Sequence, residues 1–180
     1  MDNLTTFLRV IRPFALCPDR RREAEQEAVR QLIDEIASGS RLSYLPNGAP
    51  YIEGCSCNIS ISHTRGFVAF VAQPKPYPAG IDIEYRSERA LRVGRRFLSP
   101  EEYAALDGHH TAEHALLCWC AKETLYKLQG TPVSDYRNDL CLAPFPFATS
   151  GTIQATVSGH PFLLALELTP AYACVWNVTP

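Results

Sequence analysis

Two acidic side chains alternate with isoleucines in residues 80–84. Successive side chains of a β-strand point to opposite faces, so Asp82 and Glu84 would share one face while Ile81 and Ile83 face the core. Neighbouring carboxylates repel each other. Proteins tolerate them by solvation at an edge, or by a hard cation such as Mg²⁺ that also recruits phosphate oxygens. The segment therefore indicates either a solvated strand face or a metal site suited to phosphate chemistry.

A second charged pair lies in residues 119–127. Glu123 and Lys127 are four residues apart, so they would share one face of a helix. One interpretation is a surface ion pair that stabilises the helix by about 0.2 to 0.5 kcal/mol. The other is a phosphate-transfer site, in which the carboxylate holds a cation and the ammonium meets the phosphate.

The spacing of apolar residues predicts the helices that would carry such groups. A first amphipathic helix is expected over about 19–37, with Asp19 as its N-cap. A longer helix is expected over about 111–129, and Gly130 would end it. This longer helix contains the second charged pair.

Strand patterns and prolines predict the remaining architecture. Residues 58–62 alternate strictly between polar and apolar, which is typical of a half-buried strand, and a hairpin to residues 67–72 would place Ser62 and His63 at its tip. Three prolines between 73 and 80 exclude a helix or a central strand there. We therefore expect one α+β domain, 1–180, of two similar strand-and-helix halves: about 1–73 and 80–180, joined by a linker at 74–79.

Composition limits the classes of protein that fit. The chain has 180 residues, 46% of them hydrophobic, and a formal net charge of -2, which is typical of one compact unit and gives no electrostatic reason to bind nucleic acid or an anionic membrane. No apolar run reaches the roughly 18 to 20 residues of a membrane span, and no signal peptide is recognisable, so a cytoplasmic protein is expected. An odd number of cysteines, 7, favours free thiols over a disulfide framework.

Four segments together resemble the 4'-phosphopantetheinyl transferase superfamily, in the family's order and with similar gaps. They are residues 59–64, 80–84, 96–103 and 119–127. The resemblance covers roughly residues 20 to 180 and favours the larger single-chain, surfactin-synthetase-activating type. It implies two pseudo-repeated halves related by pseudo-twofold symmetry, with the active site in the cleft between them. It also implies transfer of the 4'-phosphopantetheine arm of coenzyme A to a serine of an apo acyl or peptidyl carrier protein, with release of 3',5'-ADP.

The resemblance further implies roles for individual residues. The residues that match the family's magnesium positions are Asp82, Glu84 and Glu123. The residues that match its contacts to coenzyme A are Gly48, Ser62, His63, Lys122 and Lys127. In the implied reaction Lys127 stabilises the leaving phosphate, while Glu123 or Glu102 takes the serine proton.

Glu102 has two interpretations that the sequence leaves open. It matches a glutamate that helps to deprotonate the serine in the larger subfamily. Ser99 and Glu102 also have the spacing of a capping box, in which the glutamate binds only the Ser99 amide at the start of a helix.

One motif departs from the family's pattern. The family's Gly-Lys-Pro, which precedes the hairpin, is replaced at residues 48–50 by Gly-Ala-Pro, so a lysine that would bind the 3'-phosphate of the nucleotide is missing at Ala49. Arg21 is a basic residue that could substitute in binding coenzyme A.

An arginine-rich stretch is the candidate docking surface for a carrier. Residues 86–96 contain five arginines and one acid, Glu88, and carrier proteins are typically acidic. The candidates for docking are Arg86, Arg89, Arg92 and Arg96. The alternative is a solvated charged helix or loop. Because both halves lie in one chain, a monomer would suffice.

Two other groups of potential metal ligands are interpreted as structural. The cysteines at 55, 57, 118 and 120 lack zinc-site spacing and are expected to be small core residues. His110 and His114 are four residues apart but have no evident third ligand, so they are expected at the surface where a helix starts.

Two other functions remain open. A magnesium-dependent phosphohydrolase would use the same carboxylates with water as the nucleophile. A relative without catalytic activity would act as a binding or scaffolding protein. Which carrier or pathway the protein would serve is not indicated by the sequence.

Overall fold

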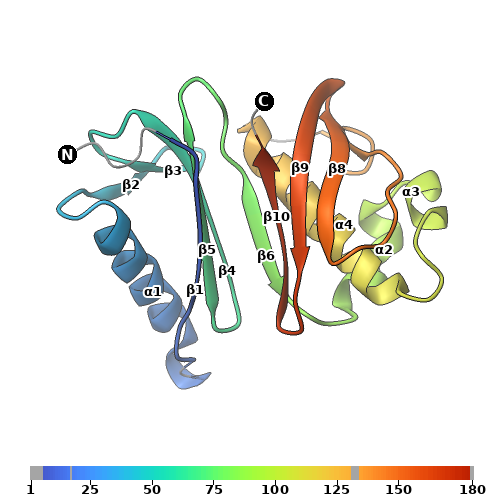
Figure 1. Ribbon diagram of the computed structural model, residues 1–180, viewed down its shortest axis with the longest axis horizontal. Coiled ribbons are helices and arrows are strands. Elements are labelled where there is room, and N and C mark those ends of the chain that lie inside the picture. Colours follow the sequence, from blue (N-terminus) through green and yellow to red (C-terminus); the bar gives the residue numbers. More distant parts are fainter. Residues whose placement is uncertain (1–5, 17, 131–133, 179–180) are drawn as a thin grey trace.

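The computed structural model describes residues 6–16, 18–130 and 134–178, which form a mixed arrangement of helices and antiparallel sheets (Figure 1). A 3-10 turn at Pro18–Arg20 precedes the first helix. The helices and strands, in chain order, are β1 (Leu8–Pro13), α1 (Arg21–Ile36), β2 (Leu42–Tyr44), β3 (Pro50–Ile52), β4 (Cys57–Thr64), β5 (Phe67–Pro74), β6 (Ile81–Tyr85), α2 (Arg89–Phe97), α3 (Pro100–Ala104), α4 (Thr111–Gln129), β7 (Leu140–Leu142), β8 (Ser150–Val157), β9 (His160–Leu168) and β10 (Tyr172–Val178). The predicted α+β class is confirmed.

Two sheets form the body of the protein. The first has the strand order β1-β5-β4 and the second has the order β6-β10-β9-β8-β7, while β2 and β3 form a small separate pair. In Figure 1, α1 lies beside the first sheet and α4 crosses behind the second. Leu32 and Ile33 of α1 share a core cluster with Val68 and Phe70 of β5. The sheets differ in strand number, and a pseudo-twofold relation between the halves is not shown.

Side-chain hydroxyls join the edge strands of the two sheets, β4 and β6. Ser60 Oγ accepts a hydrogen bond from the backbone N–H of Ile81 at 3.2 Å, and Thr64 Oγ1 accepts one from that of Tyr85 at 3.0 Å. Between them, Ser62 Oγ accepts from the N–H of residue 83 at 3.3 Å. An edge strand has unpaired N–H groups that must find partners when buried. The polar face of β4 supplies these partners and is therefore buried, not solvated as its alternation suggested.

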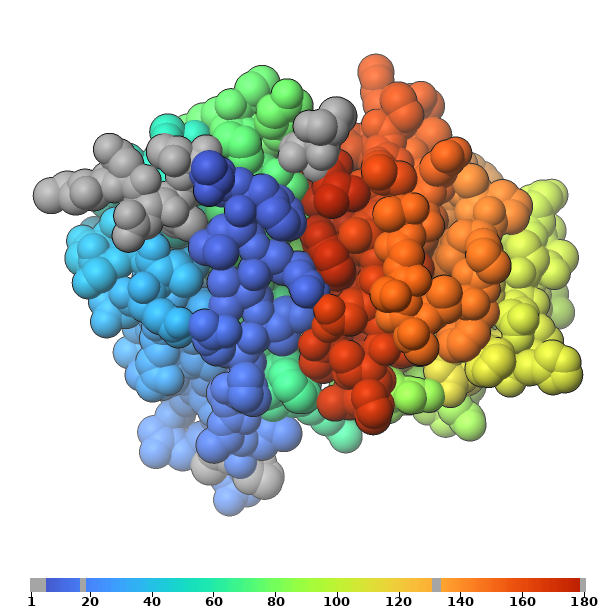
Figure 2. All heavy atoms as spheres, viewed as in Figure 1, coloured from blue at the N-terminus to red at the C-terminus, as the bar shows by residue number. Residues whose placement is uncertain are grey.

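A second contact joins the sheets on the face shown in Figure 2, where β1 packs directly against β10. Arg9 Nη2 on β1 donates to Glu167 Oε2 at 3.0 Å, and its guanidinium lies 4.0 Å from the ring centre of Trp176. A cation over an aromatic face is attracted by the ring's quadrupole. The two sheets are thus held together along two lines of contact.

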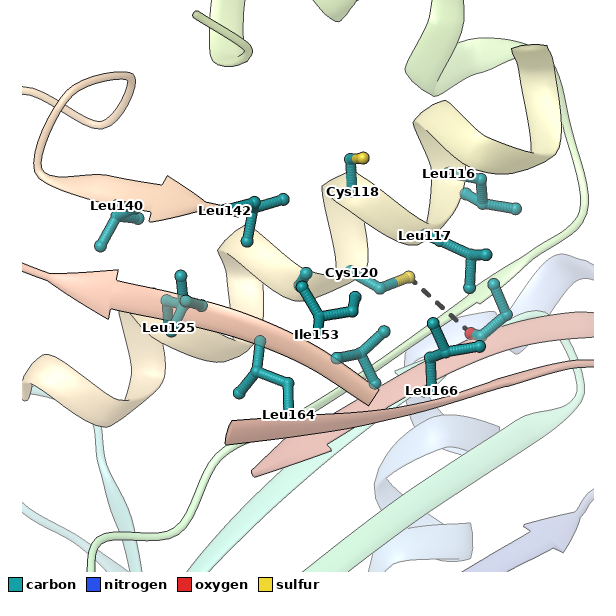
Figure 3. Close-up of a cluster of buried hydrophobic side chains, with 14 of the residues drawn as sticks. Leu116, Leu117, Cys118, Cys120, Leu125, Leu140, Leu142, Ile153, Leu164 and Leu166 are labelled. Carbon is teal, nitrogen blue, oxygen red and sulfur yellow. Dashed lines mark hydrogen bonds between the residues drawn. The ribbon is translucent and has the colours of Figure 1, made fainter. Parts of the chain in front are cut away.

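Helix α4 has the predicted bounds and forms the centre of the larger core. It ends at Gly130, whose φ of 67° is the left-handed conformation that glycine adopts without steric cost. Its buried face packs against β8 and β9 through Leu117, Leu125, Ile153 and Leu164 (Figure 3). No helix in the described ranges combines the length and apolar character that crossing a bilayer would require.

Two local predictions, the tip of the hairpin and the N-cap of the first helix, were displaced by one or two residues. The hairpin turns at Arg65 and Gly66, because β4 continues to Thr64, so Ser62 and His63 lie within the strand and not at the tip. Helix α1 begins at Arg21, and Asp19 lies in the preceding 3-10 turn, so it does not cap the helix.

The expected core position holds for Cys57, Cys118 and Cys120, and Cys55 is partly buried against the same cluster as Cys57. Cys118 and Cys120 are buried core residues, and burial raises the pKa of the Cys118 thiol to about 12. Cys55 and Cys57 are joined in a disulfide, so the expectation of free thiols is wrong for this pair. Their Cα atoms are 5.4 Å apart, a separation that a disulfide readily spans.

His114 is buried, which corrects the expected surface position. Its side chain packs edge-on against Phe145 at 4.6 Å between ring centres, and its Nδ1 accepts a hydrogen bond from the Asp107 N–H at 3.0 Å. His110 is exposed and lies 3.1 Å from Asp107 Oδ1. Burial lowers the pKa of His114, and the opposing charge of Asp107 does not cancel this effect.

Stability should therefore fall as the pH drops below 6.5, the ordinary pKa of histidine. In that range the unfolded chain binds the His114 proton more readily than the folded one does, so the free energy of unfolding decreases with falling pH, by at most about 1.4 kcal/mol per pH unit. Urea unfolding at a series of pH values from neutral to mildly acidic measures this. His114→Gln should flatten the dependence, and an equally steep curve for the variant would contradict the prediction.

Candidate active site

Asp82 on β6 is the centre of the candidate site. Its side chain is buried, and its Oδ1 accepts hydrogen bonds from Ser62 Oγ at 2.8 Å and from Lys127 Nζ at 2.9 Å. Lys127 Nζ also donates to the Ile81 carbonyl at 2.7 Å. Asp82 Oδ2 is buried and has no hydrogen-bond partner among the described residues. Because a buried carboxylate oxygen without a partner costs free energy, this atom is a candidate ligand for a cation or a donor group of a substrate.

Two glutamates flank Asp82. Burial raises the pKa of Glu84, and the charge of Asp82 raises it further, while a hydrogen bond from Trp119 acts in the opposite direction. Burial also raises the pKa of Glu123, against the effect of a 2.7 Å hydrogen bond from the Tyr136 hydroxyl, and the charge of Asp82 again adds to the shift. Negative charge is thus concentrated around Asp82, as the shared face of β6 predicted.

The three carboxylates do not by themselves form a closed ligand shell. Within the part of the chain that the structure describes, no three Asp, Glu, His or Cys side chains are arranged so as to hold a metal ion. What the structure provides is a buried, unpartnered oxygen of Asp82 and two neighbouring carboxylates of raised pKa. These groups fit a cation that would complete its shell with water or substrate oxygens, as Mg²⁺ usually does.

Two cavities adjoin this centre. The first, of about 490 Å³, is lined by Glu84 and Glu123 together with residues of α2. The second, of about 750 Å³, is lined by Lys127, by residues 45 and 47–52 and by the first residues of β4. Glu123 and Lys127 are one helical turn apart, and Lys127 binds Asp82. Asp82 lines neither cavity, but it is joined to the second through Lys127, while its neighbours Glu84 and Glu123 line the first.

Comparison with known families identifies the class to which such a site belongs. The family model described as "4'-phosphopantetheinyl transferase superfamily" matches residues 78–175, which is more than half of the chain. The chain belongs to this superfamily. The matched residues extend from the loop before β6 into β10, so they contain Asp82, Glu84, Glu123 and Lys127.

A curated relative is similar over a smaller part. A "4'-phosphopantetheinyl transferase" of Bacillus subtilis is 31% identical to this chain over 91 residues, which are 48% of this chain and 40% of that protein. The aligned part thus spans less than half of the relative's own length. The superfamily predicted from four short motifs is confirmed, whereas the larger subtype remains a proposal.

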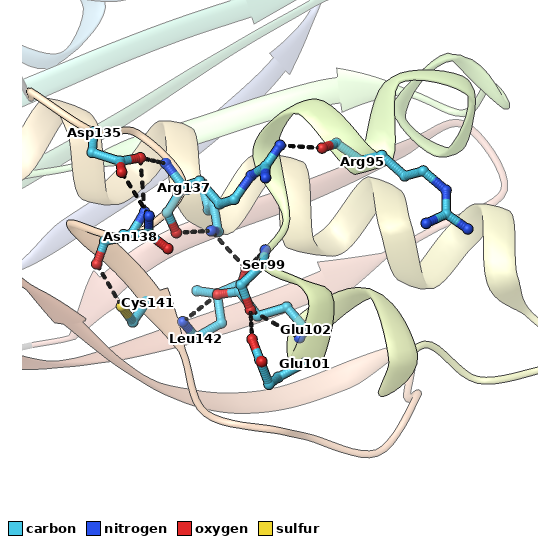
Figure 4. A network of polar contacts seen from close by, with 10 residues as sticks. Arg95, Ser99, Glu101, Glu102, Asp135, Arg137, Asn138, Cys141 and Leu142 are labelled. Atoms are coloured by element: carbon cyan, nitrogen blue, oxygen red, sulfur yellow. Dashed lines mark hydrogen bonds and ion pairs between the residues drawn. The ribbon is translucent and has the colours of Figure 1, made fainter.

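Lys122 and Glu102 form an ion pair with each other. Lys122 is 0% exposed, and its Nζ lies 2.7 Å from Glu102 Oε2 and donates to the Arg137 carbonyl at 3.1 Å. Glu102 also accepts from the N–H groups of Ser99 at 2.8 Å and Leu142 at 2.9 Å (Figure 4). The capping box is present, which settles the position of Glu102 at the start of α3. In the structure both residues are bound to protein groups, and their predicted roles at coenzyme A and at the serine stay predictions.

The other predicted contacts to coenzyme A fall in three places. Ser62 binds Asp82 at the centre. Gly48 lines the second cavity, in the turn between β2 and β3, with a φ of 84°. His63 and Arg21 lie together on the buried Glu25 of α1, with His63 Nδ1 3.5 Å from Glu25 Oε2 and Arg21 Nε 2.7 Å from Glu25 Oε1. The structure therefore does not gather these residues around a single position.

The arginines of the predicted docking surface are all exposed. Arg89 and Arg96 line the first cavity beside the carboxylates. Arg86 is paired with Glu113 at 2.5 Å, and Arg95 stacks on Tyr103 with 4.6 Å to the ring centre. The stretch therefore presents positive charge next to the opening of a cavity that contains negative charge.

Sequence reasoning missed three residues that position the carboxylates. Thr64 Oγ1 lies 3.4 Å from Glu84 Oε2, and Trp119 hydrogen bonds to the same carboxylate. Thr64 continues the period-two pattern of Ser60 and Ser62, and Trp119 lies one helical turn before Glu123, so both could have been found by extending the patterns already used. Tyr136 follows no such pattern, since it reaches Glu123 from a loop beyond the end of α4.

Proposed function

We propose that this protein transfers the 4'-phosphopantetheine arm of coenzyme A to a serine of an apo acyl or peptidyl carrier protein and releases 3',5'-ADP. The observation that carries the proposal is the buried Asp82, with one oxygen bound by Lys127 and the other without a partner among the described residues, while Lys127 lines one cavity and the neighbouring Glu84 and Glu123 line another. Membership of the superfamily supports the same reaction.

The proposal includes a magnesium ion that is held by Asp82, Glu84 and Glu123. The support is the unpartnered Oδ2 of Asp82 and the raised pKa of both glutamates, since a cation would stabilise the ionised forms that burial disfavours. When bound, a divalent cation supplies positive charge that neutralises the pyrophosphate during transfer.

The side chains of the chain itself provide the remaining steps. The serine oxygen attacks the β-phosphorus of coenzyme A, and the bond from that phosphorus to the bridging oxygen breaks. Lys127 stabilises the negative charge on the leaving 3',5'-ADP. Glu123 accepts the serine proton as the general base. Tyr136 orients Glu123 through its hydrogen bond.

In this proposal the two cavities hold different parts of the substrates. The nucleotide of coenzyme A occupies the second cavity, next to Lys127, and the pantetheine arm extends into the first, where the carrier's serine arrives. The exposed arginines, Arg89 and Arg96 among them, dock the acidic carrier beside that opening. Because one chain supplies both cavities, we propose that a monomer is active and that it is of the larger, single-chain type with two related halves.

The deciding experiment is mass spectrometry of apo carrier proteins incubated with this protein, coenzyme A and Mg²⁺. A carrier should gain the mass of one phosphopantetheine group, and the same carrier with its acceptor serine replaced by alanine should not. Carriers from fatty-acid, polyketide and peptide synthesis should be tried. No mass gain on any of them would contradict the proposal, and release of phosphate from coenzyme A without a carrier would favour a phosphohydrolase instead.

A further inference from the structure

The second cavity has the charge and shape of an anion site. Of the described residues that line it, the charged ones are Lys75 and Lys127, both cationic, and none is acidic. Tyr51 and Tyr126 also line it, and these residues are 38% and 43% exposed. Flat apolar faces beside isolated cations suit a nucleobase that carries phosphate groups.

The two lysines of this cavity differ in their availability. Lys127 is already bound to Asp82 and to the carbonyl of Ile81, which places it at the reacting centre. Lys75 is exposed and has no ion-pair partner among the described residues. The cavity therefore has a second positive charge that is free to bind a ligand at a distance from the first.

The backbone around Lys75 is held in place on the cavity wall. Its N–H donates to the carbonyl of Ser56 at 3.4 Å, and the Asn58 amide donates to the carbonyl of Tyr77 at 2.7 Å. The carbonyl of Pro78 accepts from Asn177 at 2.9 Å. Prolines at 74, 76 and 78 further restrict the backbone dihedrals. Binding through Lys75 thus orders a side chain on a backbone that is already ordered, which reduces the entropic cost.

Coenzyme A has two anionic groups at separate positions, the pyrophosphate and the 3'-phosphate of the ribose. With the pyrophosphate at Lys127, the second group needs a cation elsewhere in the same cavity. Arg21, which the sequence suggested, is paired with Glu25 and does not line this cavity. We propose that Lys75 binds the 3'-phosphate of coenzyme A and so makes the site selective for coenzyme A over its dephospho form. This inference rests on the proposed function.

Calorimetric titration of the full chain with coenzyme A and with 3'-dephospho-coenzyme A tests the assignment without measuring activity. The unmodified protein should bind coenzyme A about 10-fold or more tightly than the dephospho form, as a charge-assisted phosphate contact would provide. Lys75→Met should weaken coenzyme A binding by about that factor and leave dephospho-coenzyme A binding unchanged, so that the preference disappears. Lys75→Glu should reverse the preference. Because Lys75 is exposed, both variants should fold normally.

The control is Arg21→Met, which should keep the preference for coenzyme A. A Lys75→Met protein that retains the preference would overturn the role of Lys75 while leaving the proposed transferase function intact. Equal affinity of the unmodified protein for both ligands would likewise overturn the role of Lys75 and leave the proposed transferase function intact. Failure of the unmodified protein to bind either ligand, with Mg²⁺ present, would overturn the proposed function and this inference with it.

Discussion

Asp82→Asn should reduce the rate of phosphopantetheine transfer by about 1,000-fold. Asparagine has nearly the same shape and can keep the hydrogen bond from Ser62, but it removes the negative charge that binds Lys127 and that would hold the cation. Transition-state stabilisation should be lost while the fold is retained. Initial rates of mass gain on a carrier, at saturating coenzyme A and a series of Mg²⁺ concentrations, measure the effect.

The matched control is Asp34→Asn, the same chemical change at an exposed position on α1. It should transfer at the rate of the unmodified protein. Circular dichroism melts of both variants establish that they are folded. If folded Asp82→Asn protein worked within about threefold of the unmodified rate, Asp82 could not be the centre of the site, since loss of one stabilising group at a reacting centre typically costs at least about 100-fold.

Lys122→Met should lower the free energy of unfolding by about 3 to 5 kcal/mol, because it leaves Glu102 as an unpaired charge in a site that excludes water. Urea denaturation measures the loss. Glu102→Gln combined with Lys122→Met should be less destabilising than the sum of the two single changes, since the cost arises from leaving one partner alone.

The matched control for this experiment is Lys75→Met, the same substitution at an exposed lysine, which should stay within about 0.5 kcal/mol of the unmodified protein. The two variants also separate structural from binding roles. Coenzyme A affinity per folded molecule should be unaffected by Lys122→Met. If the Lys122→Met protein were stable but bound coenzyme A weakly, Lys122 would be a contact to the pyrophosphate.

Interactions between neighbouring residues define much of the local structure. Helix α4 has its predicted bounds because the signals that define them, an apolar repeat and Gly130, lie within the helix or directly at its end. The capping box of Ser99 and Glu102 is likewise set by a spacing of three residues. The superfamily was recognised from four short motifs, because the residue types that phosphate chemistry requires are few.

The contacts that those residues make depend on how distant segments pack together. Lys122 and Lys127 belong to one motif, yet five residues of helix separate them by about 140° around the axis, so one reaches Glu102 and the other Asp82. The polar face of β4 is buried because the edge of β6, some twenty residues later, needs hydrogen-bond acceptors. The cationic wall at Lys75 depends on the linker folding over the start of β4. Each outcome depends on contacts between segments far apart in the chain, which the spacing of neighbouring residues does not encode.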